Sequence, residues 1–192
     1  ACKDTYGKLD FVVHAVAFAN KDDLTGHFSD TDLDGWRTAL EVSAYSLIPM
    51  AKYAKPLMKE GGSILTLSYY GGEKSVPNYN IMGVAKAALE ASVRYLAAEF
   101  GPDQIRVNAL SAGPVKTLAG KGISGFDILY KISEARAPMK RNITLEEVGN
   151  SGLYLCSDLS SAVTGETHHV DCGYHSIGTT KADAKIVGVE AE

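Results

Sequence analysis

The sequence predicts an α/β fold in which helices cover a doubly wound parallel sheet within a single domain. Three observations predict it: short apolar, β-branched runs, helical patterns that separate these runs, and a length of 192 residues, which suits one domain with a sizeable core. Strands that alternate with helices of this length imply a parallel sheet built from right-handed βαβ units.

Four runs have the composition and length of strands. They are Leu9–His14, Ser63–Ser68, Ile105–Leu110 and Thr167–Val170. Because the carboxyl ends of parallel strands point to one edge of a sheet, the segments that follow the first three strands should meet there. Those segments are small, polar or contain glycine, as a cleft lining should be: Ala15–Asn20, Ser68–Gly72 and Ser111–Thr117.

Caps and stop signals mark three helices. They run from Thr31 or Asp32 to about Lys59, from about Asn78 to Phe100, and from the capping box at Thr144 to about Ser157. A break in the first is expected near Pro49, and Gly101-Pro102 is a strong stop for the second.

The stretch from 118 to 140 has helical composition over Phe126–Ala135, but glycines and Pro138 interrupt it. Two interpretations stay open, a mobile lid over a site and an ordinary surface connection. Residues 1–177 are expected to belong to the domain, and the small, polar stretch 178–192 to be a flexible tail.

Composition excludes several classes of protein. Hydrophobic residues make up 45% and charged residues 22%, as in soluble globular proteins. The net charge of −4 argues against a broad nucleic-acid-binding surface, and no apolar run approaches the ~18 residues that span a bilayer. No signal peptide is visible.

The cysteines Cys2, Cys156 and Cys172 are odd in number and widely spaced, so we expect reduced thiols in a cytosolic protein, with no zinc site.

Two tyrosines and a lysine carry the candidate chemistry. Tyr79 follows Tyr69 by ten positions, and Lys86 follows Tyr79 by seven, which places Tyr79 and Lys86 on one helix face roughly 10 Å apart along the axis. A phenol can donate to an oxygen that becomes negative, and a nearby lysine can lower its pKa and hold a ligand's hydroxyls. The alternative is a core tyrosine and a solvated lysine. Their position between a strand and a helix favours the chemical interpretation.

Other motifs are weaker. Tyr70 and Lys74 have a Tyr-x3-Lys spacing, but two glycines between them make a poor helix, so we reject them as a catalytic pair. The turn Ser111–Thr117 exposes backbone groups that could pair with a planar amide, and its threonine could reach a phosphate. His168 and His169 face opposite sides of a strand, one buried and one outward, and are poorly placed as joint metal ligands.

Together these segments resemble the enoyl-acyl-carrier-protein reductases of bacterial fatty-acid synthesis, a Rossmann-like branch of the short-chain dehydrogenase/reductase superfamily. That family shows Tyr-x6-Lys, here Tyr79 and Lys86, where most of the superfamily has Tyr-x3-Lys. It also has a tyrosine, here Tyr69, where the catalytic serine usually sits. The resemblance extends from about Lys8 to Tyr174 and includes the stretches 111–119, 150–151 and 156–160.

The resemblance implies reduction of the trans-2 double bond of an enoyl thioester by hydride from NADH, with NADPH not excluded. Tyr79 would stabilise the enolate through the thioester carbonyl, Lys86 would bind the nicotinamide ribose, and Tyr69 would contact the acyl thioester. The implied cofactor-binding residues are Ala15, Val16, Lys86, Val115, Lys116, Thr117, Leu118 and Ala119. The implied substrate contacts are Phe18, Ala19, Tyr69 and Tyr79, with 118–136 as the loop that closes over the acyl chain.

Some features depart from the family pattern. Ala17 stands where the family commonly has glycine, and Cys172 replaces the first glycine of a common Asp-Gly-Gly. No glycine-rich phosphate loop is found. The resemblance implies that this loop, its strand, the next βα unit and the residue that selects NAD over NADP would precede Ala1, so that residues 1–177 would be the C-terminal three-quarters of the domain. It also implies an acyl carrier protein as partner, no nucleic-acid or membrane partner, a cytoplasmic location and a homotetramer packed through Thr31–Lys59 and Asn78–Phe100.

Two other functions remain open on the same fold. One is a reductase of ketones, ketoacyl thioesters or pteridines. The other is a non-catalytic dinucleotide-sensing or scaffold protein, for which the missing phosphate loop is the best support.

Overall fold

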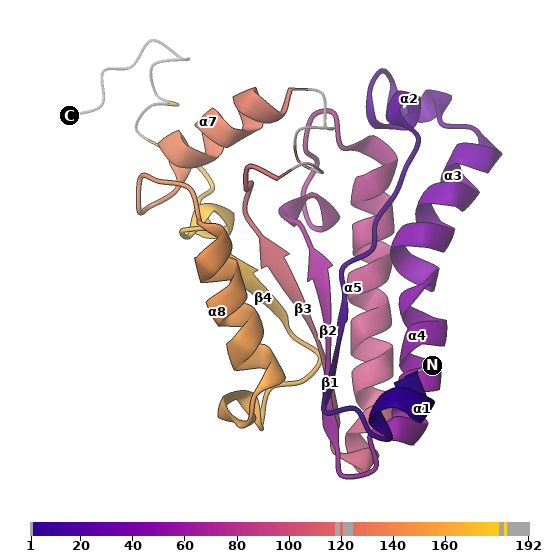
Figure 1. Cartoon of the computed structure of the whole chain (residues 1–192). Helices are drawn as coiled ribbons and strands as arrows, with labels where there is room; N and C mark the ends of the chain where they lie inside the picture. Colours follow the sequence, from indigo (N-terminus) through magenta and orange to yellow (C-terminus); the bar gives the residue numbers. More distant parts are fainter. Residues whose placement is uncertain (1, 118–119, 121–124, 181–182, 184–192) are drawn as a thin grey trace.

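A four-stranded parallel sheet forms the centre of the computed structural model, which describes residues 2–117, 120, 125–180 and 183. Its strands lie side by side in chain order (Figure 1): β1 (Phe11–His14), β2 (Gly62–Ser68), β3 (Ile105–Ala112) and β4 (Thr167–Val170). In the register, Val12 lies opposite Ile64, and Ser111 lies opposite both Ser68 and His169. The predicted doubly wound parallel sheet is confirmed.

Helices cover both faces of this sheet (Figure 1). On one face lie α3 (Leu33–Leu40), α4 (Leu47–Ala54) and α5 (Asn80–Phe100), and on the other lies α8 (Leu145–Cys156). The alternation of side chains along β2 explains why, because Ile64 joins the core of α4 and α5 while Leu65 packs with Leu155 of α8. Two short helices, α1 (Cys2–Tyr6) and α2 (Lys21–Leu24), were not predicted, and α7 (Phe126–Arg136) lies beyond the carboxyl ends of the strands.

The crossovers between strands do not all have one hand. The first two pass over the face that carries α4 and α5, the third passes over the face that carries α8, and the strand order advances in one direction throughout. The third crossover is therefore opposite in hand to the first two, and the prediction of uniformly right-handed units is wrong. The apolar side chains of Leu65 and Leu110 on that face of β2 and β3 are buried by Leu155 of α8, so the third crossover covers the face that the first two leave open.

The helix ends follow their local chemistry. The Asp32 carboxylate accepts a hydrogen bond from Gly35 N at 2.7 Å, so Asp32 rather than Thr31 caps α3. The break predicted near Pro49 is misplaced, because a π-helical turn at Glu41–Tyr45 separates α3 from α4. Pro49 sits in the first turn of α4, the part of a helix that tolerates proline. The predicted capping box of α8 and the end of α5 at Phe100 are both confirmed.

Two negative findings concern the part of the chain that the structure describes. There, none of the helices combines the length and the apolar character needed to cross a membrane. No group of three or more histidine, cysteine, aspartate or glutamate side chains in those residues could hold a metal ion. Most of the tail predicted to be flexible lies outside the described residues.

Candidate active site

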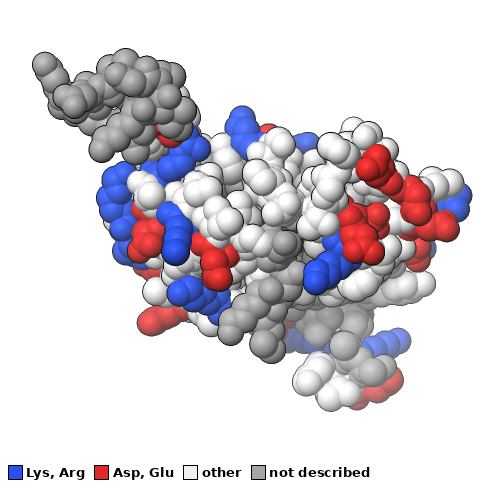
Figure 2. Space-filling view, turned by 90° about the horizontal axis from the view of Figure 1, so that it is seen from above, with Lys and Arg blue, Asp and Glu red and all other residues white. Residues whose placement is uncertain are grey.

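The predicted loops meet at the carboxyl edge of the sheet, as the parallel register requires. Seen from that edge, uncharged side chains cover the middle of the surface and charged ones gather toward its rims (Figure 2). A pocket of about 240 Å³ opens there between the end of β3, the loop after β2 and α7. Its lining includes Tyr69, Tyr70, Gly113, Leu129, Ile132 and Tyr174.

Tyr69 and Tyr79 lie against each other at this edge. Their ring centroids are 4.9 Å apart and their planes make an angle of 69°, the edge-to-face arrangement that aromatic pairs favour. Tyr79 immediately precedes α5 and is 7% exposed. Gly71 provides the space, because a Cβ there would lie 2.4 Å from Cδ1 of Tyr79. The structure thus brings the two predicted phenols together.

Burial makes both phenols weak acids. It raises the pKa of Tyr79 far above its usual value, with further rises from Tyr69 and Glu90. Burial, and to a smaller extent Tyr174, raises the pKa of Tyr69 to about 12. The expectation that a lysine lowers the phenol's pKa is wrong in this structure, because desolvation outweighs any nearby positive charge. Tyr79 therefore keeps its proton at neutral pH and can act as a hydrogen-bond donor.

Lys86 lies two turns along α5 and is 6% exposed. Its ammonium donates to the carbonyl of Leu67 at 2.7 Å, the one hydrogen bond found for it among the described residues. Burial lowers the pKa of Lys86 to about 8, although the nearby Glu90 carboxylate opposes this. An ammonium has three N–H donors, so two remain that could bind ligand hydroxyls, such as those of a ribose.

Glu90 is a buried acid at the site that the sequence reasoning missed. It lies four residues after Lys86 on α5, and its Oε1 accepts a short hydrogen bond from the hydroxyl of Ser68. Burial raises its pKa, the Ser68 hydroxyl opposes the rise, and Glu73 adds to it. The i, i+4 spacing from Lys86 was the available signal. Because Ser68 directly precedes Tyr69, this contact fixes the end of β2.

The loop after β1 is held by the π-helical turn. The buried hydroxyl of Ser43 donates to the carbonyl of Phe18 and accepts from its N–H, both at 2.9 Å. Just beyond this turn, the hydroxyl of Ser46 lies 2.8 Å from Nε2 of the fully buried His14, whose Nδ1 lies 2.8 Å from the hydroxyl of Thr66. Burial lowers the pKa of His14, and Lys86 adds to this. The sequence reasoning gave no role in the site to Ser43, Ser46 or His14.

The residues expected to contact substrate and cofactor on this loop are accessible. Ala15, Val16 and Phe18 are exposed at the carboxyl edge, and they present apolar surface there. Ala19 packs against the cluster that contains Tyr79. These positions suit contact with a flat, apolar ring.

The expected cofactor residues after β3 are placed only in part. The Lys116 ammonium lies 4.5 Å from the ring centroid of Tyr130 in α7, and the Thr117 hydroxyl accepts from Gly120 N at 3.0 Å. Val115 is half-buried beside them, and its carbonyl accepts from Thr117 N. The remaining two expected residues, Leu118 and Ala119, lie outside the described residues. Together with the spare donors of Lys86, these positions fit a nicotinamide cofactor.

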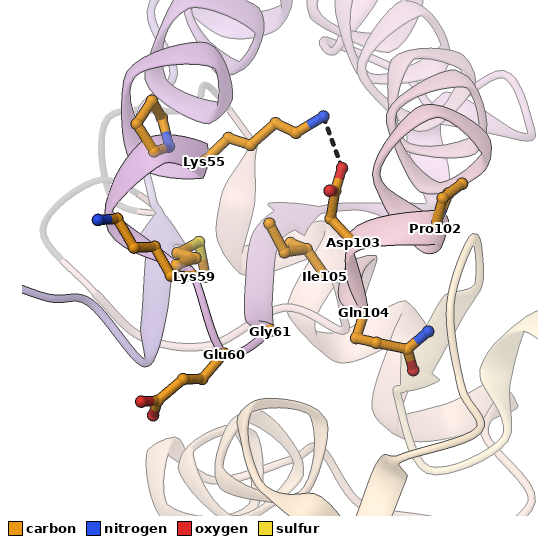
Figure 3. A pocket seen from close by; sticks show the side chains of 10 residues that line it. Lys55, Lys59, Glu60, Gly61, Pro102, Asp103, Gln104 and Ile105 are labelled. Carbon is orange, nitrogen blue, oxygen red and sulfur yellow. Dashed lines mark ion pairs between the residues drawn. The ribbon is translucent and has the colours of Figure 1, made fainter.

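A larger hollow lies at the other end of the sheet. It has a volume of about 710 Å³, and the Lys55–Asp103 ion pair of 2.8 Å lies beside it (Figure 3). Its lining comes from the segments 55–61 and 102–105, at the amino ends of β2 and β3. None of the predicted site residues lines it, and open α/β sheets bind ligands at the carboxyl edge. We therefore assign the site to the pocket of about 240 Å³, which Tyr69 lines, and to the adjoining hollow of about 390 Å³, which Tyr79 lines together with Gly71 and Gly72.

Comparison with known proteins agrees with this geometry. The family model described as enoyl-(acyl carrier protein) reductase matches residues 1–175. An enoyl-[acyl-carrier-protein] reductase [NADH] of Rhizobium meliloti is 57% identical over 98% of this chain and 70% of its own length. An NADPH-dependent relative of Staphylococcus aureus is also 57% identical, over 89% of this chain and 67% of its own length.

Solved structures give the same result. The reductase of Anaplasma phagocytophilum in complex with NAD is 56% identical to this chain and superposes with a TM-score of 0.90. The superposed region covers 93% of this chain and 68% of the Anaplasma reductase. The reductase of Bacillus cereus with NADP+ is 54% identical, with a TM-score of 0.90, and covers 92% of this chain and 69% of its own.

Proposed function

This chain belongs to the enoyl-acyl-carrier-protein reductase family, and we propose that Tyr79, Lys86 and Tyr69 carry the reaction of that family here. The reaction reduces the trans-2 double bond of an enoyl thioester in type II fatty-acid synthesis. The nicotinamide cofactor, when bound, supplies the hydride that reaches the β-carbon of the substrate.

The protein's part is to stabilise charge on the thioester oxygen. Addition at the β-carbon moves negative charge onto that oxygen, which becomes an enolate. The Tyr79 hydroxyl would donate a hydrogen bond to it, and its raised pKa keeps the donor protonated. Hydrogen bonds to developing charge are strong in a site that excludes water. The buried, protonated Tyr79 against Tyr69 is the observation that carries the proposal.

Lys86 and Tyr69 have supporting roles. The Lys86 ammonium, already held by the Leu67 carbonyl, would use its remaining donors on the hydroxyls of the nicotinamide ribose. Tyr69 faces the pocket that α7 covers and would contact the acyl thioester. The exposed surface of Val16 and the segment Val115–Thr117 would flank the cofactor. In α7, Leu129 and Ile132 give that pocket an apolar wall for the acyl chain.

The test is turnover. Protein expressed from the complete gene should oxidise NADH or NADPH when given a trans-2-enoyl thioester, and not when given a 3-ketoacyl thioester.

Tyr79→Phe should lower kcat by about 10²–10³, the effect of removing one donor to a developing oxyanion. Tyr6→Phe, a matched change at a position 68% exposed and outside the expected interface, should leave kcat unchanged. Full activity of the Tyr79→Phe protein would remove the assignment. Tight NADH binding without turnover of either thioester would favour a non-catalytic role.

Assembly and location complete the proposal. We expect a homotetramer in the cytoplasm, as the family resemblance implies. Exposed aromatic side chains on the helices expected at the interface support it, because Tyr53 of α4 is 73% exposed and Tyr95 of α5 is 81% exposed. Light scattering on the purified protein should give four times the mass of one chain, and a monomer would contradict it.

A further inference from the structure

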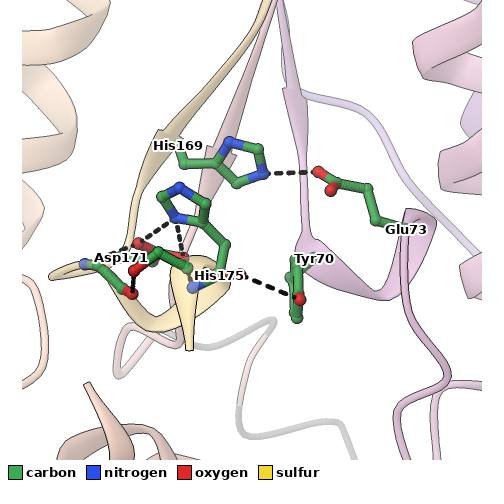
Figure 4. Close-up of polar contacts among 7 residues, drawn as sticks. Tyr70, Glu73, His169, Asp171 and His175 are labelled. Atoms are coloured by element: carbon green, nitrogen blue, oxygen red, sulfur yellow. Dashed lines mark hydrogen bonds and ion pairs between the residues drawn. The ribbon is translucent and has the colours of Figure 1, made fainter. Parts of the chain in front are cut away.

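Beside the acyl pocket, two histidine rings stack on each other and each is bonded to a carboxylate (Figure 4). The ring centroids of His169 in β4 and His175 are 4.0 Å apart, with an angle of 20° between their planes. Nε2 of His169 lies 2.5 Å from Oε1 of Glu73, and Nδ1 of His175 lies 3.0 Å from the carboxylate of Asp171. We call these four residues the histidine stack.

The neighbouring His168 lies on the opposite face of β4, as predicted, and packs against the ring of Tyr154 at 6.1 Å. The prediction that one of the adjacent histidines is buried and the other faces outward is wrong, because both are partly buried. Helix α8 covers one face of β4, and the histidine stack covers the other. His168 therefore offers a matched control for His169.

The stack is anchored at one end by the turn that follows the buried Asp171. The Asp171 carboxylate accepts from Gly173 N at 2.9 Å and from His175 N at 2.8 Å, in addition to the ring nitrogen of His175. Cys172, between these groups, has a φ of 57°, in the left-handed region. The carboxylate thus fixes the turn in the form that places the His175 ring over His169.

At its other end, the stack holds the turn that follows Tyr69. This glycine turn, a single 3₁₀ turn at Tyr70–Gly72, contains two glycines and has little stiffness of its own. One side of it packs on α5, where a Cβ on Gly83 would lie 2.7 Å from the carbonyl of Gly71. On the side of β4, two polar contacts tie it down: Glu73 with His169, and the Tyr70 hydroxyl with the carbonyl of His175 at 3.3 Å.

We propose that Glu73 and His169 are positioning residues that hold the glycine turn, and with it the Tyr69 ring, against the acyl pocket. Tyr70, Asp171 and Tyr174 line that same pocket, so the stack forms part of its wall. The mechanism uses none of the four residues of the stack. The proposal rests on the proposed function, because it is the acyl thioester that Tyr69 would contact.

Kinetics on paired variants test it. His169→Phe keeps a ring to stack on His175 but removes the bond to Glu73, and Glu73→Ala removes it from the other side. With trans-2-octenoyl-coenzyme A as the probe, each should raise KM roughly fivefold and leave kcat nearly unchanged, as expected for one lost hydrogen bond that positions a contact. The double variant should match the single variants, because both remove the same interaction.

Controls separate positioning from a general loss of structure. His168→Phe, the matched change on the other face of β4, should leave KM within about twofold. Glu73→Gln keeps an acceptor for His169 and should restore most of the affinity that Glu73→Ala loses. Unchanged KM in His169→Phe, or fully additive effects of the two changes, would overturn the proposal.

Binding without turnover keeps this test independent of the reaction. Octanoyl-coenzyme A, titrated calorimetrically, should bind roughly fivefold more weakly to His169→Phe than to the native protein. If the native protein reduces no enoyl thioester, the proposed function falls, while the titration still decides whether the stack shapes the acyl pocket. Equal affinities in this titration would overturn the positioning role alone.

Discussion

Replacing Lys86 with methionine should remove the free-energy cost of burying a charged ammonium in the folded state, a penalty that depends on pH. Lys86 is buried, and its pKa falls from 10.5 to about 8. Since the unfolded chain keeps the higher value, it binds more protons than the folded chain between these two pH values. The penalty is therefore fully present below pH 8 and is released as the pH rises toward 10.5. The native protein gains stability over that window, and the methionine variant, which has no amine there, does not.

The magnitude follows from the two pKa values. At 1.36 kcal/mol per tenfold change in proton affinity, the penalty is about 3 kcal/mol near pH 7 and about 1.4 kcal/mol near pH 9.5. The free energy of unfolding of the native protein should thus rise by about 2 kcal/mol relative to that of Lys86→Met over this range. Methionine suits the comparison because its unbranched, apolar chain fills a similar space. Ionisation of tyrosines in the unfolded chain affects both proteins and cancels.

Urea unfolding of both proteins at several pH values measures this difference. Lys52→Met, a change at an exposed lysine of α4, is the control and should show a difference that stays flat with pH. A difference for Lys86→Met that changes by less than about 0.5 kcal/mol, or that falls as pH rises, would refute the argument that burial dominates at Lys86.

Three further changes test the backbone around the site. Ser43→Ala should cost about 1–2 kcal/mol of stability in urea unfolding, because it leaves both backbone groups of Phe18 without their partner; an unchanged midpoint would contradict this. Gly83→Ala should cost about 1–3 kcal/mol, because its Cβ would lie 2.7 Å from the Gly71 carbonyl, and a neutral effect would mean that the glycine turn yields freely. Cys172→Gly should stabilise by about 0.5–1 kcal/mol, since glycine adopts a positive φ without strain, and a lower midpoint of thermal unfolding would argue against strain there.

Most of the fold could be predicted because it depends on local pattern. The four strands are apolar runs between turn signals, and the Thr144 capping box and the Gly101-Pro102 stop act within a few residues of the helix ends that they set. The π-helical turn could not be predicted, since the segment Glu41–Tyr45 has ordinary helical composition. The π-helical turn is associated instead with hydrogen bonds between Ser43 and Phe18, in a loop 25 residues earlier in the sequence. The local signal at Pro49 pointed to the wrong break for this reason.

The site divides in a similar way. The seven-residue step from Tyr79 to Lys86 is visible in the sequence, and the resemblance gave each of these residues a role. Their electrostatics were not visible, because the raised pKa of Tyr79 depends on how deeply neighbouring elements bury it. Glu90 and His14 were missed because their importance shows only in three dimensions. Each is buried against a polar side chain from another element, Glu90 against Ser68 and His14 against Thr66.

The surroundings of His14 also determine where its proton sits. The Ser46 hydroxyl gives its hydrogen to the carbonyl of Val42 at 2.6 Å, so it can only accept from Nε2 of His14. His14 then carries its proton on Nε2, and in the neutral ring Nδ1 accepts from the Thr66 hydroxyl at 2.8 Å, a closer partner for that hydrogen than the His14 carbonyl at 3.2 Å. One helix carbonyl thus fixes the direction of three successive hydrogen bonds and selects a single neutral tautomer. The His14 ring, whose pKa the Lys86 ammonium helps to lower, is therefore neutral and adds no second positive charge near Lys86.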